Sequence, residues 1–244
     1  MSYVLITGAS GGIGQAVASL VASHGWDPIC VGRSAAKLRE RLPGLRHVEA
    51  DVTQEAQVKG MFEDLEGDDV LSSALIHCVG STLIGPLERV SAAQYAETIS
   101  INLTSAFLVS AHFIGALKRA SKPGSVVLFS SVVARIGVAN HEIIAAAKAG
   151  IEGFALSAAA SYANLGIRVN VVAPGLTETP LTERMLSSEV GRAAASKQYP
   201  IAGINHASDV AEAAHWLISP QSVRITGHVI PVDGGFSRIR PLVR

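Results

Sequence analysis

A run of glycines near the start of the chain has the residue types and the spacing of a phosphate-binding loop. It reads Thr7-Gly8-Ala9-Ser10-Gly11-Gly12-Ile13-Gly14 and lies between an apolar run over 3–7 and a segment of helical spacing over 13–24. Glycine lets the backbone turn sharply and come close to a ligand, and the free amides at the start of a helix bind a diphosphate. A tight strand-to-helix turn without a ligand would have the same glycines, but the strand before it and the helix after it favour a dinucleotide site.

The residues after the second apolar run bear on which dinucleotide would bind. A ribose 2′-hydroxyl calls for an acidic side chain about 20 residues beyond the glycines, and the sequence there reads Val31-Gly32-Arg33-Ser34. The guanidinium of Arg33 can form a fork with a 2′-phosphate, and Ser34 can add a hydroxyl donor. We therefore expect NADP(H) rather than NAD(H); a solvated arginine at a helix start is the alternative.

A third group of side chains falls on one face of the helix expected over 142–163. His141, Ile144 and Lys148 share a face if the helix reaches back that far, because two helical turns take about seven residues. An imidazole can donate a proton near neutral pH, so His141 is a candidate acid; a position at the surface or in a subunit interface is the alternative. No group of His, Cys, Asp and Glu has the spacing of metal ligands, so we expect no metal site.

The alternation of elements along the chain predicts the scaffold that would bring these residues together. Short β-branched runs alternate with longer segments of helical spacing, which is typical of a parallel sheet covered on both faces. Right-handed crossovers then give a Rossmann-like, doubly wound α/β sheet of about seven strands, which binds ligands at the carboxyl ends of its strands. The expected strands are 3–7, 28–32, 46–50, 71–79, 125–130, 167–173 and 228–232, and the expected helices are 13–24, 35–42, 54–65, 92–120, 142–163 and 208–218.

Composition predicts a single domain over 1–244. The chain has 244 residues, of which 48% are hydrophobic and 16% charged, and this excludes a disordered protein. Its 20 Lys and Arg balance 20 Asp and Glu, whereas a nucleic-acid binder or an anionic-membrane binder would show basic excess or a polybasic segment. The sequence has no run of about 18 uncharged apolar residues, so we expect no helix that spans a membrane. It shows no basic leader of a signal peptide. Cys30 and Cys78 both lie in apolar runs, which is typical of buried thiols. We therefore expect a cytoplasmic protein that binds neither nucleic acid nor membrane.

The chain resembles the short-chain dehydrogenase/reductase family over essentially its whole length. The glycine string fits the family pattern TGxxxGxG. This resemblance implies the doubly wound fold, a nicotinamide cofactor, and dimers or tetramers formed through the two long helices. The further marks, in the family's order, are Asp51-Val52, a degraded turn at His77-Cys78-Val79-Gly80, Asn102, Ser130-Ser131, Lys148, Pro174-Gly175 and Asp233-Gly234-Gly235.

The resemblance also exposes one departure from the family's chemistry. Family members usually work with Asn, Ser, Tyr and Lys, but the position four before Lys148 holds Ile144 instead of tyrosine. By resemblance, Lys148 binds the nicotinamide ribose, Ser131 polarises the substrate oxygen and Asn102 holds a relay water. His141 stands where enoyl-thioester reductases of the family carry a variant tyrosine, so the resemblance supports it as the replacement acid.

A cofactor site follows from the same resemblance. Asp51 is similar to the family's acceptor for the adenine amino group, and a helix N-cap is the other role open to it. Residues 176–200 resemble the family's substrate lid, from which Tyr199 could fold back. The expected cofactor-binding residues are Thr7, Gly8, Ser10, Gly11, Gly12, Ile13, Gly14, Arg33, Ser34, Asp51, Val52, Cys78, Val79, Gly80, Lys148, Pro174, Gly175, Thr177 and Thr179.

These features together predict an NADP(H)-dependent oxidoreductase with an altered proton-donor site. Its substrate would be a small carbonyl compound or an activated alkene of the enone or enoyl type. The expected catalytic residues are Asn102, Ser131, His141 and Lys148. The alternative is a catalytically silent NADP(H)-binding structural or regulatory protein, against which the retention of Lys148, Asn102 and Ser131 argues. We expect a homodimer or a homotetramer.

Overall fold

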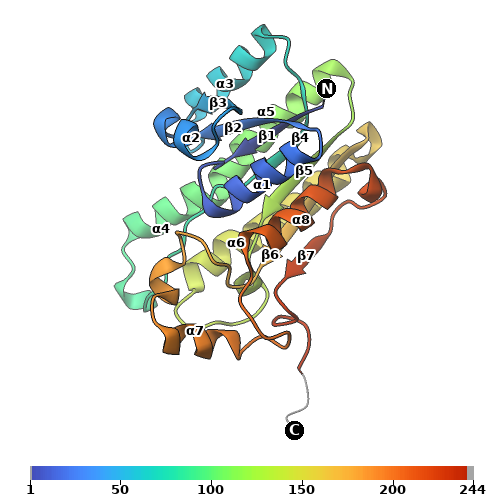
Figure 1. Ribbon diagram of the computed structural model, residues 1–244. Helices are drawn as coiled ribbons and strands as arrows, with labels where there is room; N and C mark the ends of the chain where they lie inside the picture. The colour runs from blue at the N-terminus through green and yellow to red at the C-terminus, as the bar shows by residue number, and fades with distance from the viewer. Residues whose placement is uncertain (1, 241–244) are drawn as a thin grey trace.

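Seven parallel strands form one sheet in the order β3-β2-β1-β4-β5-β6-β7 (Figure 1). The computed structural model describes residues 2–240. The strand order reverses between β1 and β4, and this is the point where such sheets bind ligands. The predicted doubly wound α/β sheet is therefore confirmed. The strands are β1 (Tyr3–Thr7), β2 (Asp27–Gly32), β3 (Arg46–Glu49), β4 (Ser72–His77), β5 (Gly124–Phe129), β6 (Ile167–Pro174) and β7 (Val229–Val232).

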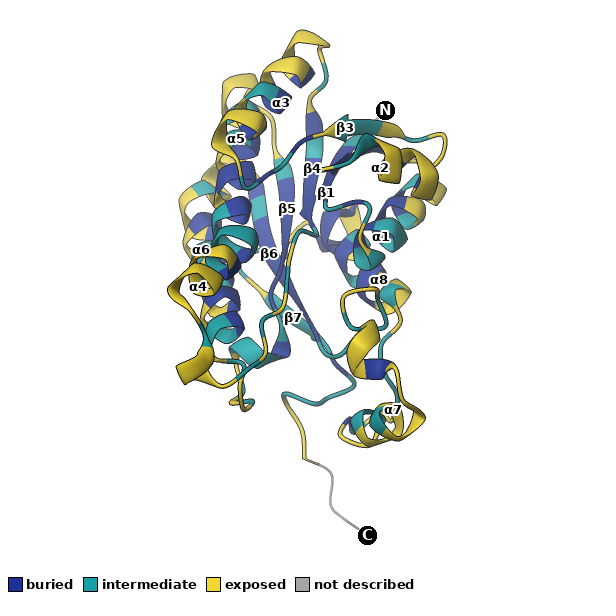
Figure 2. Cartoon of the chain, turned by 90° about the vertical axis from the view of Figure 1, so that its left-hand side faces the viewer, coloured by how far each residue is buried: buried dark blue, intermediate teal, exposed yellow. Residues whose placement is uncertain are grey.

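Helices cover both faces of the sheet (Figure 2). The helices α3, α5 and α6 lie on one face, where Leu75, Phe113 and Ile151 are buried in one core, and α1, α2 and α8 lie on the other. The apolar runs of the sequence become strands because both of their faces are covered. The helices are α1 (Gly12–Ser23), α2 (Ala35–Arg41), α3 (Glu55–Gly67), α4 (Ala92–Ile99), α5 (Ser105–Ala120), α6 (Glu142–Tyr162), α7 (Glu189–Ser196) and α8 (Ala207–Ile218).

The helix expected over 92–120 is interrupted, which corrects the sequence analysis. A π-helical turn over Ser100–Thr104 joins α4 to α5, and the Ser105 amide donates to the Ser100 carbonyl. A turn of this kind inserts one residue into an otherwise regular helix, and it often occurs at functional sites. Asn102 lies within it, so the irregularity falls on a predicted site residue.

Two helical segments are long and strongly apolar, although neither is free of charged residues. Ala92–Ala120 and Glu142–Leu165 both reach a mean hydropathy of 1.4, which by length and composition would suffice to cross a membrane. Both segments pack on the sheet, with Phe113 and Ile151 1% exposed in the core beneath them. Core helices of an α/β protein pass the same test, so the packing accounts for their apolar character.

Candidate active site

A cavity of about 380 Å³ lies beyond the carboxyl ends of the central strands. Its lining comes from four stretches of chain: 78–84 after β4, 129–133 from the end of β5, 138–148 before and at the start of α6, and 174–199 from the end of β6. Ile13 of the glycine loop and Phe236 complete it. The cavity is therefore at the edge of the sheet where doubly wound folds bind their ligands.

Lys148 is the charged group of this cavity. Its side chain is only 7% exposed, and its Nζ donates to the carbonyl of Phe129 over 2.9 Å. Burial lowers the pKa of Lys148 to about 8 from its ordinary 10.5. A Cβ placed on Gly80 would lie 3.4 Å from Lys148 Nζ and 3.2 Å from Asn102 Oδ1, so the turn after β4 approaches both side chains. The ammonium can donate further hydrogen bonds into the cavity.

The two serines after β5 have different surroundings. Ser130 Oγ contacts Glu152 Oε1 at 2.8 Å and the Lys148 carbonyl at 3.2 Å, and Glu152 also pairs with Arg135 at 2.7 Å. Ser131 Oγ accepts from the Val133 amide at 3.4 Å and keeps its own proton available. Both serines line the cavity, but Ser131 has the hydroxyl that is free to donate to a ligand.

His141 and Ile144 also line the cavity with Lys148. His141 is the residue just before α6, and Ile144 lies in its first turn. His141 Nδ1 lies 2.7 Å from the carbonyl of Ala139, so Nδ1 carries a proton and donates it there. A neutral imidazole has only one N–H, which leaves its Nε2 without a proton. His141 can therefore donate to a ligand only as an imidazolium. Ile144 is 4% exposed and brings no polar atom.

Asn102 lies behind the cavity instead of in its lining. Its Oδ1 accepts from the Ser81 amide at 3.1 Å, and its Nδ2 donates to Ser81 Oγ at 2.9 Å and to the Thr98 carbonyl at 3.0 Å. The side-chain amide is thus committed to protein partners. It fixes the turn after β4, including Ser81, which does line the cavity.

A buried histidine connects this turn with the glycine loop. Ser105 Oγ uses its proton to donate to the Ile101 carbonyl at 2.6 Å, so it accepts from His77 Nε2 at 3.0 Å. Because the neutral imidazole then carries its proton on Nε2, its Nδ1 accepts from Thr7 Oγ1 at 2.7 Å. Burial, and secondly the charge of Lys148, lower the pKa of His77 to about 3. The imidazole therefore stays neutral and holds the ends of β1 and β4 to the π-helical turn.

The glycine loop has the form that a diphosphate site requires. Gly8 adopts φ +70°, and a Cβ there would lie 2.9 Å from Cys78 C and Val79 N, so only glycine lets the loop lie against this turn. Gly11 precedes α1, whose first turn has no acidic residue and no side-chain cap. The first amides of α1 are therefore available to an anion.

The end of β2 places the residues expected to select the cofactor. Gly32 ends β2, and a Cβ built on it would lie 3.5 Å from Ser10 Oγ of the glycine loop. Arg33 follows and is exposed, while Ser34 caps α2 by accepting from the Lys37 amide at 3.3 Å. The hydroxyl proton of Ser34 stays available to a ligand.

Asp51 does not cap a helix, which corrects one of its two expected roles. The helix α3 begins after Gln54, whereas Asp51 Oδ1 accepts from the amide and the hydroxyl of Thr53 at 3.0 and 2.7 Å. Such a local turn keeps the carboxylate at the end of β3. Val52 beside it is 4% exposed.

The segment 176–200 lies over the cavity and contains two elements that the sequence did not predict, a 3₁₀ turn at Glu183–Leu186 and α7. Tyr199, which the sequence allowed but did not require to fold back, lines the cavity at the end of this segment. Its hydroxyl accepts from the Leu176 amide at 2.7 Å, and burial raises its pKa. The phenol therefore joins the last part of the segment to its first.

The structure brings most of the predicted residues to this one edge of the sheet. Among residues 2–240, no group of three or more His, Cys, Asp and Glu could hold a metal ion. Asn102 is the one expected catalytic residue whose side chain is outside the cavity lining. The expected residues that line the cavity are Ile13, Cys78, Val79, Gly80, Ser131, His141, Lys148, Pro174, Gly175, Thr177 and Thr179.

Comparison with known proteins agrees with this geometry. A family model described as enoyl-(acyl carrier protein) reductase matches residues 8–237. The chain belongs to the short-chain dehydrogenase/reductase family. It is 33% identical to cis-4-hydroxycyclohexanecarboxylate dehydrogenase of Sinomonas cyclohexanicum over 242 residues, which cover 96% of each chain. It is 32% identical to the 3-oxoacyl-[acyl-carrier-protein] reductase FabG of Vibrio cholerae over 244 residues, covering 96% of this chain and 97% of the relative.

A solved structure shares the fold closely. The structure of ElxO with NADP bound superposes with a TM-score of 0.90 and 25% identity, covering 96% of this chain and 98% of the other. As a member of this oxidoreductase family, the chain has a site for a nicotinamide cofactor. The glycine loop and the cavity described above are adjacent, since Ile13 belongs to both.

Proposed function

We propose that this chain is an NADP(H)-dependent oxidoreductase that transfers hydride to or from a small, uncharged carbonyl compound or activated alkene. The observation that carries the proposal is the placement of Lys148, a buried cation, in a largely apolar cavity beside the glycine loop. A nicotinamide cofactor supplies the hydride when it is bound. Lys148 would hold the ribose of that cofactor through ammonium hydrogens that point into the cavity.

Three observations support NADP(H) over NAD(H). Gly32 places no carboxylate at the end of β2, Arg33 is exposed beside it, and Ser34 has a hydroxyl proton to donate. A guanidinium binds a 2′-phosphate in a two-pronged geometry, whereas a 2′-hydroxyl calls for an acid. ElxO, a relative of the same fold, binds NADP.

The lining of the cavity supports an uncharged substrate. Among the described residues that line it there is no Asp, Glu or Arg, and Lys148 is the only cation apart from the titratable His141. Apolar side chains such as Ile84, Leu181 and Met185 occupy much of the remainder. Because the bound cofactor would engage Lys148, a charged substrate would lose its hydration here without a free partner, which is costly. Apolar compounds with one polar group fit instead.

The proton that accompanies the hydride has two candidate routes. In ketone reduction the carbonyl electrons move to oxygen, which must take a proton, and Ile144 has none to give. His141 could give one as an imidazolium. In conjugate reduction hydride joins the far carbon of an enone, and the electron pair moves to give an enolate whose oxygen accepts a hydrogen bond from Ser131. Water then protonates the carbon next to the carbonyl. The second route needs no strong acid in the protein.

Turnover of NADPH against a panel of neutral ketones, enones, quinones and enoyl thioesters tests the proposal. We expect loss of NADPH absorbance with at least one compound, and a slower reaction in Ser131→Ala. Tight NADPH binding without turnover of any compound would instead favour the catalytically silent protein. Lys148→Ala should weaken cofactor binding in either case, so it reports on the site and not on the chemistry.

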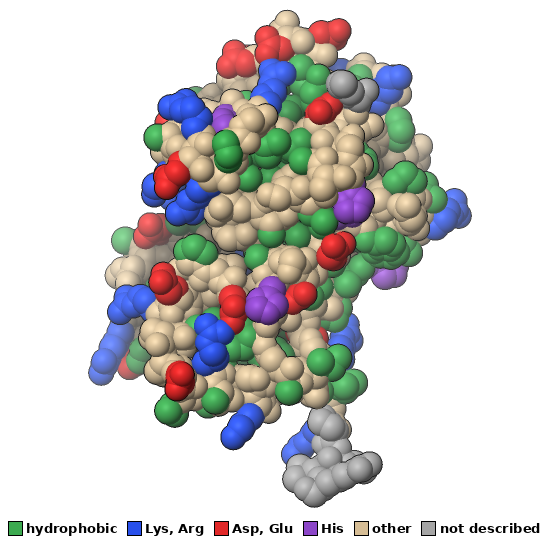
Figure 3. Space-filling model, viewed as in Figure 1, with side chains coloured by type: hydrophobic (Ala, Val, Ile, Leu, Met, Phe, Trp, Pro, Cys, Tyr) green, Lys and Arg blue, Asp and Glu red, His purple; other side chains and the backbone are tan. Residues whose placement is uncertain are grey.

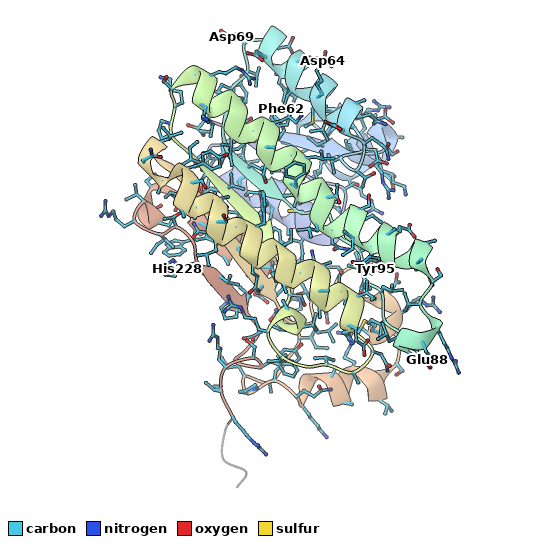
Figure 4. All side chains as sticks on the ribbon, turned by 180° about the vertical axis from the view of Figure 1, so that it is seen from behind. Phe62, Asp64, Asp69, Glu88, Tyr95 and His228 are labelled. Atoms are coloured by element: carbon cyan, nitrogen blue, oxygen red, sulfur yellow. The ribbon has the colours of Figure 1, made fainter. Side chains whose placement is uncertain are left out.

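The assembly and the location of the protein are part of the same proposal. Figure 4 shows α5 and α6 side by side on the back of the molecule, where Phe107 and Leu156 are 50% and 62% exposed. Burying such apolar side chains in a homodimer or homotetramer would stabilise it. Cys30 and Cys78 are unpaired thiols, which supports a reducing, cytoplasmic location. Neither nucleic acid nor membrane is proposed as a partner.

A further inference from the structure

The segment after β2 lies next to the glycine loop and is rich in basic residues. Residues 33–41 contain four cations, Arg33, Lys37, Arg39 and Arg41, against the single anion Glu40, so their net charge is +3, whereas the whole chain has a net charge of zero. None of the four cations lies within 4.0 Å of a carboxylate of another described residue. Figure 3 shows Lys and Arg side chains gathered around α2. This unneutralised charge favours an anionic ligand.

Arg41 is distinguished from the other three by a fixed contact. From the last turn of α2 its Nη1 donates to the carbonyl of Ser10 over 2.7 Å, across 31 positions of sequence. Ser10 belongs to the glycine loop, and Gln15 Nε2 donates to the same carbonyl at 3.1 Å. A guanidinium has five N–H donors, so most of the Arg41 fork stays available after this bond.

Arg41 and Arg33 both lie near Ser10 of the glycine loop. Ser10 adjoins the end of β2, since a Cβ on Gly32 would lie 3.5 Å from Ser10 Oγ, and Arg33 follows Gly32 directly. Arg41 reaches the same serine through its carbonyl. We infer that Arg41 is a second specificity-determining residue for NADP(H), and that it binds the 2′-phosphate together with Arg33. This inference rests on the proposed function, which supplies the 2′-phosphate.

The physical reason is pre-organisation. Arg33 is exposed at the start of α2 and must be ordered when a phosphate binds, which costs side-chain entropy. Arg41 is already held against the loop by Ser10, so it loses less freedom on binding. A phosphate dianion can accept from two guanidinium forks at once. Arg41 should therefore contribute at least as much to NADPH affinity as Arg33.

Binding of NADPH and NADH, followed by the fluorescence of the reduced nicotinamide, tests the inference without turnover. The variants are Arg41→Ala, Arg33→Ala and Arg39→Ala, the last a matched control on the same helix. Arg41→Ala should weaken NADPH binding by about 10–150-fold and leave NADH within about 2-fold. Arg39→Ala should change neither by more than about 2-fold.

The outcomes separate this inference from the proposed function. Equal NADPH and NADH affinity in the unmodified protein would contradict the NADP(H) proposal itself. A preference for NADPH that Arg33→Ala removes and Arg41→Ala keeps would overturn only the role of Arg41. An equal loss for both cofactors in Arg41→Ala would show that Arg41 merely ties α2 to the loop. Arg41→Lys keeps the charge without the fork, so a smaller loss confined to NADPH is expected there.

Discussion

Replacing Ile144 by tyrosine should create a ketone reductase. Ile144 lines the cavity four residues before Lys148 on the same helix, so a phenol there would face the bound substrate within reach of the ammonium. The ammonium would stabilise the phenolate and so favour proton transfer. General acid catalysis is worth about 10²–10⁴-fold, or roughly 3–5 kcal/mol of barrier. The cavity of about 380 Å³ has room for the larger ring.

The assay compares Ile144→Tyr with Ile144→Phe, which has nearly the same shape and no hydroxyl. NADPH oxidation with simple ketones should give a kcat/KM about 10²–10⁴-fold higher for the tyrosine variant. NADPH affinity should be equal in the two variants, because neither ring replaces a cofactor contact. If both variants fold and bind NADPH but reduce ketones equally slowly, a missing acid is not what limits this site.

Three further predictions concern the other polar groups of the cavity. Burial lowers the pKa of Lys148 to about 8, so the free protein loses the ammonium charge as pH rises through that value. NADPH affinity, measured in a binding titration, should therefore fall above about pH 8. The variant Lys148→Arg stays charged and should flatten this pH dependence. If His141 donates the proton, His141→Phe should lower kcat by about 10²–10⁴-fold with NADPH binding unchanged. Unchanged turnover would remove His141 from the mechanism. Tyr199→Phe deletes the hydroxyl that accepts from the Leu176 amide. It should lower the free energy of unfolding by about 1–3 kcal/mol, measured by thermal or denaturant unfolding. An unchanged stability would show that water replaces the phenol hydroxyl.

Most strands were predictable because β1, β2, β4, β5 and β6 are short, largely apolar runs whose residues are mostly buried. The edge strand β3 is polar and partly exposed, so its place followed from the alternation of elements along the chain. The fourth strand shows the limit of this reasoning: the apolar run extends over 71–79, but Ser72–His77 alone pair in the sheet. The spacing of apolar residues also could not show the π-helical turn, because it indicates which residues face the core and not whether a backbone amide bonds four or five residues back. The interruption at Ser100–Thr104 was therefore missed.

The candidate site was predictable where one motif fixes both residue type and position. Lys148 and Ser131 were assigned by the resemblance to the family, from their positions in the family's order of marks, and both line the cavity. Tyr199 was not predictable, since its approach depends on how segment 176–200 folds over the sheet and on the hydrogen bond to Leu176. Asp51 bonds Thr53 and not the start of α3, a choice that local sequence leaves open.

Transfer of deuterium from NADPH that carries deuterium at both hydrogen positions of C4 of the reduced nicotinamide tests the central claim most directly. The substrate would be the compound of the panel that supports NADPH loss, with the product analysed by mass spectrometry and NMR. We predict one deuterium on the former carbonyl carbon of a ketone or on the far carbon of an activated alkene. NADPH that binds without being consumed, or that is consumed without deuterium in any product, would contradict hydride transfer at this cavity.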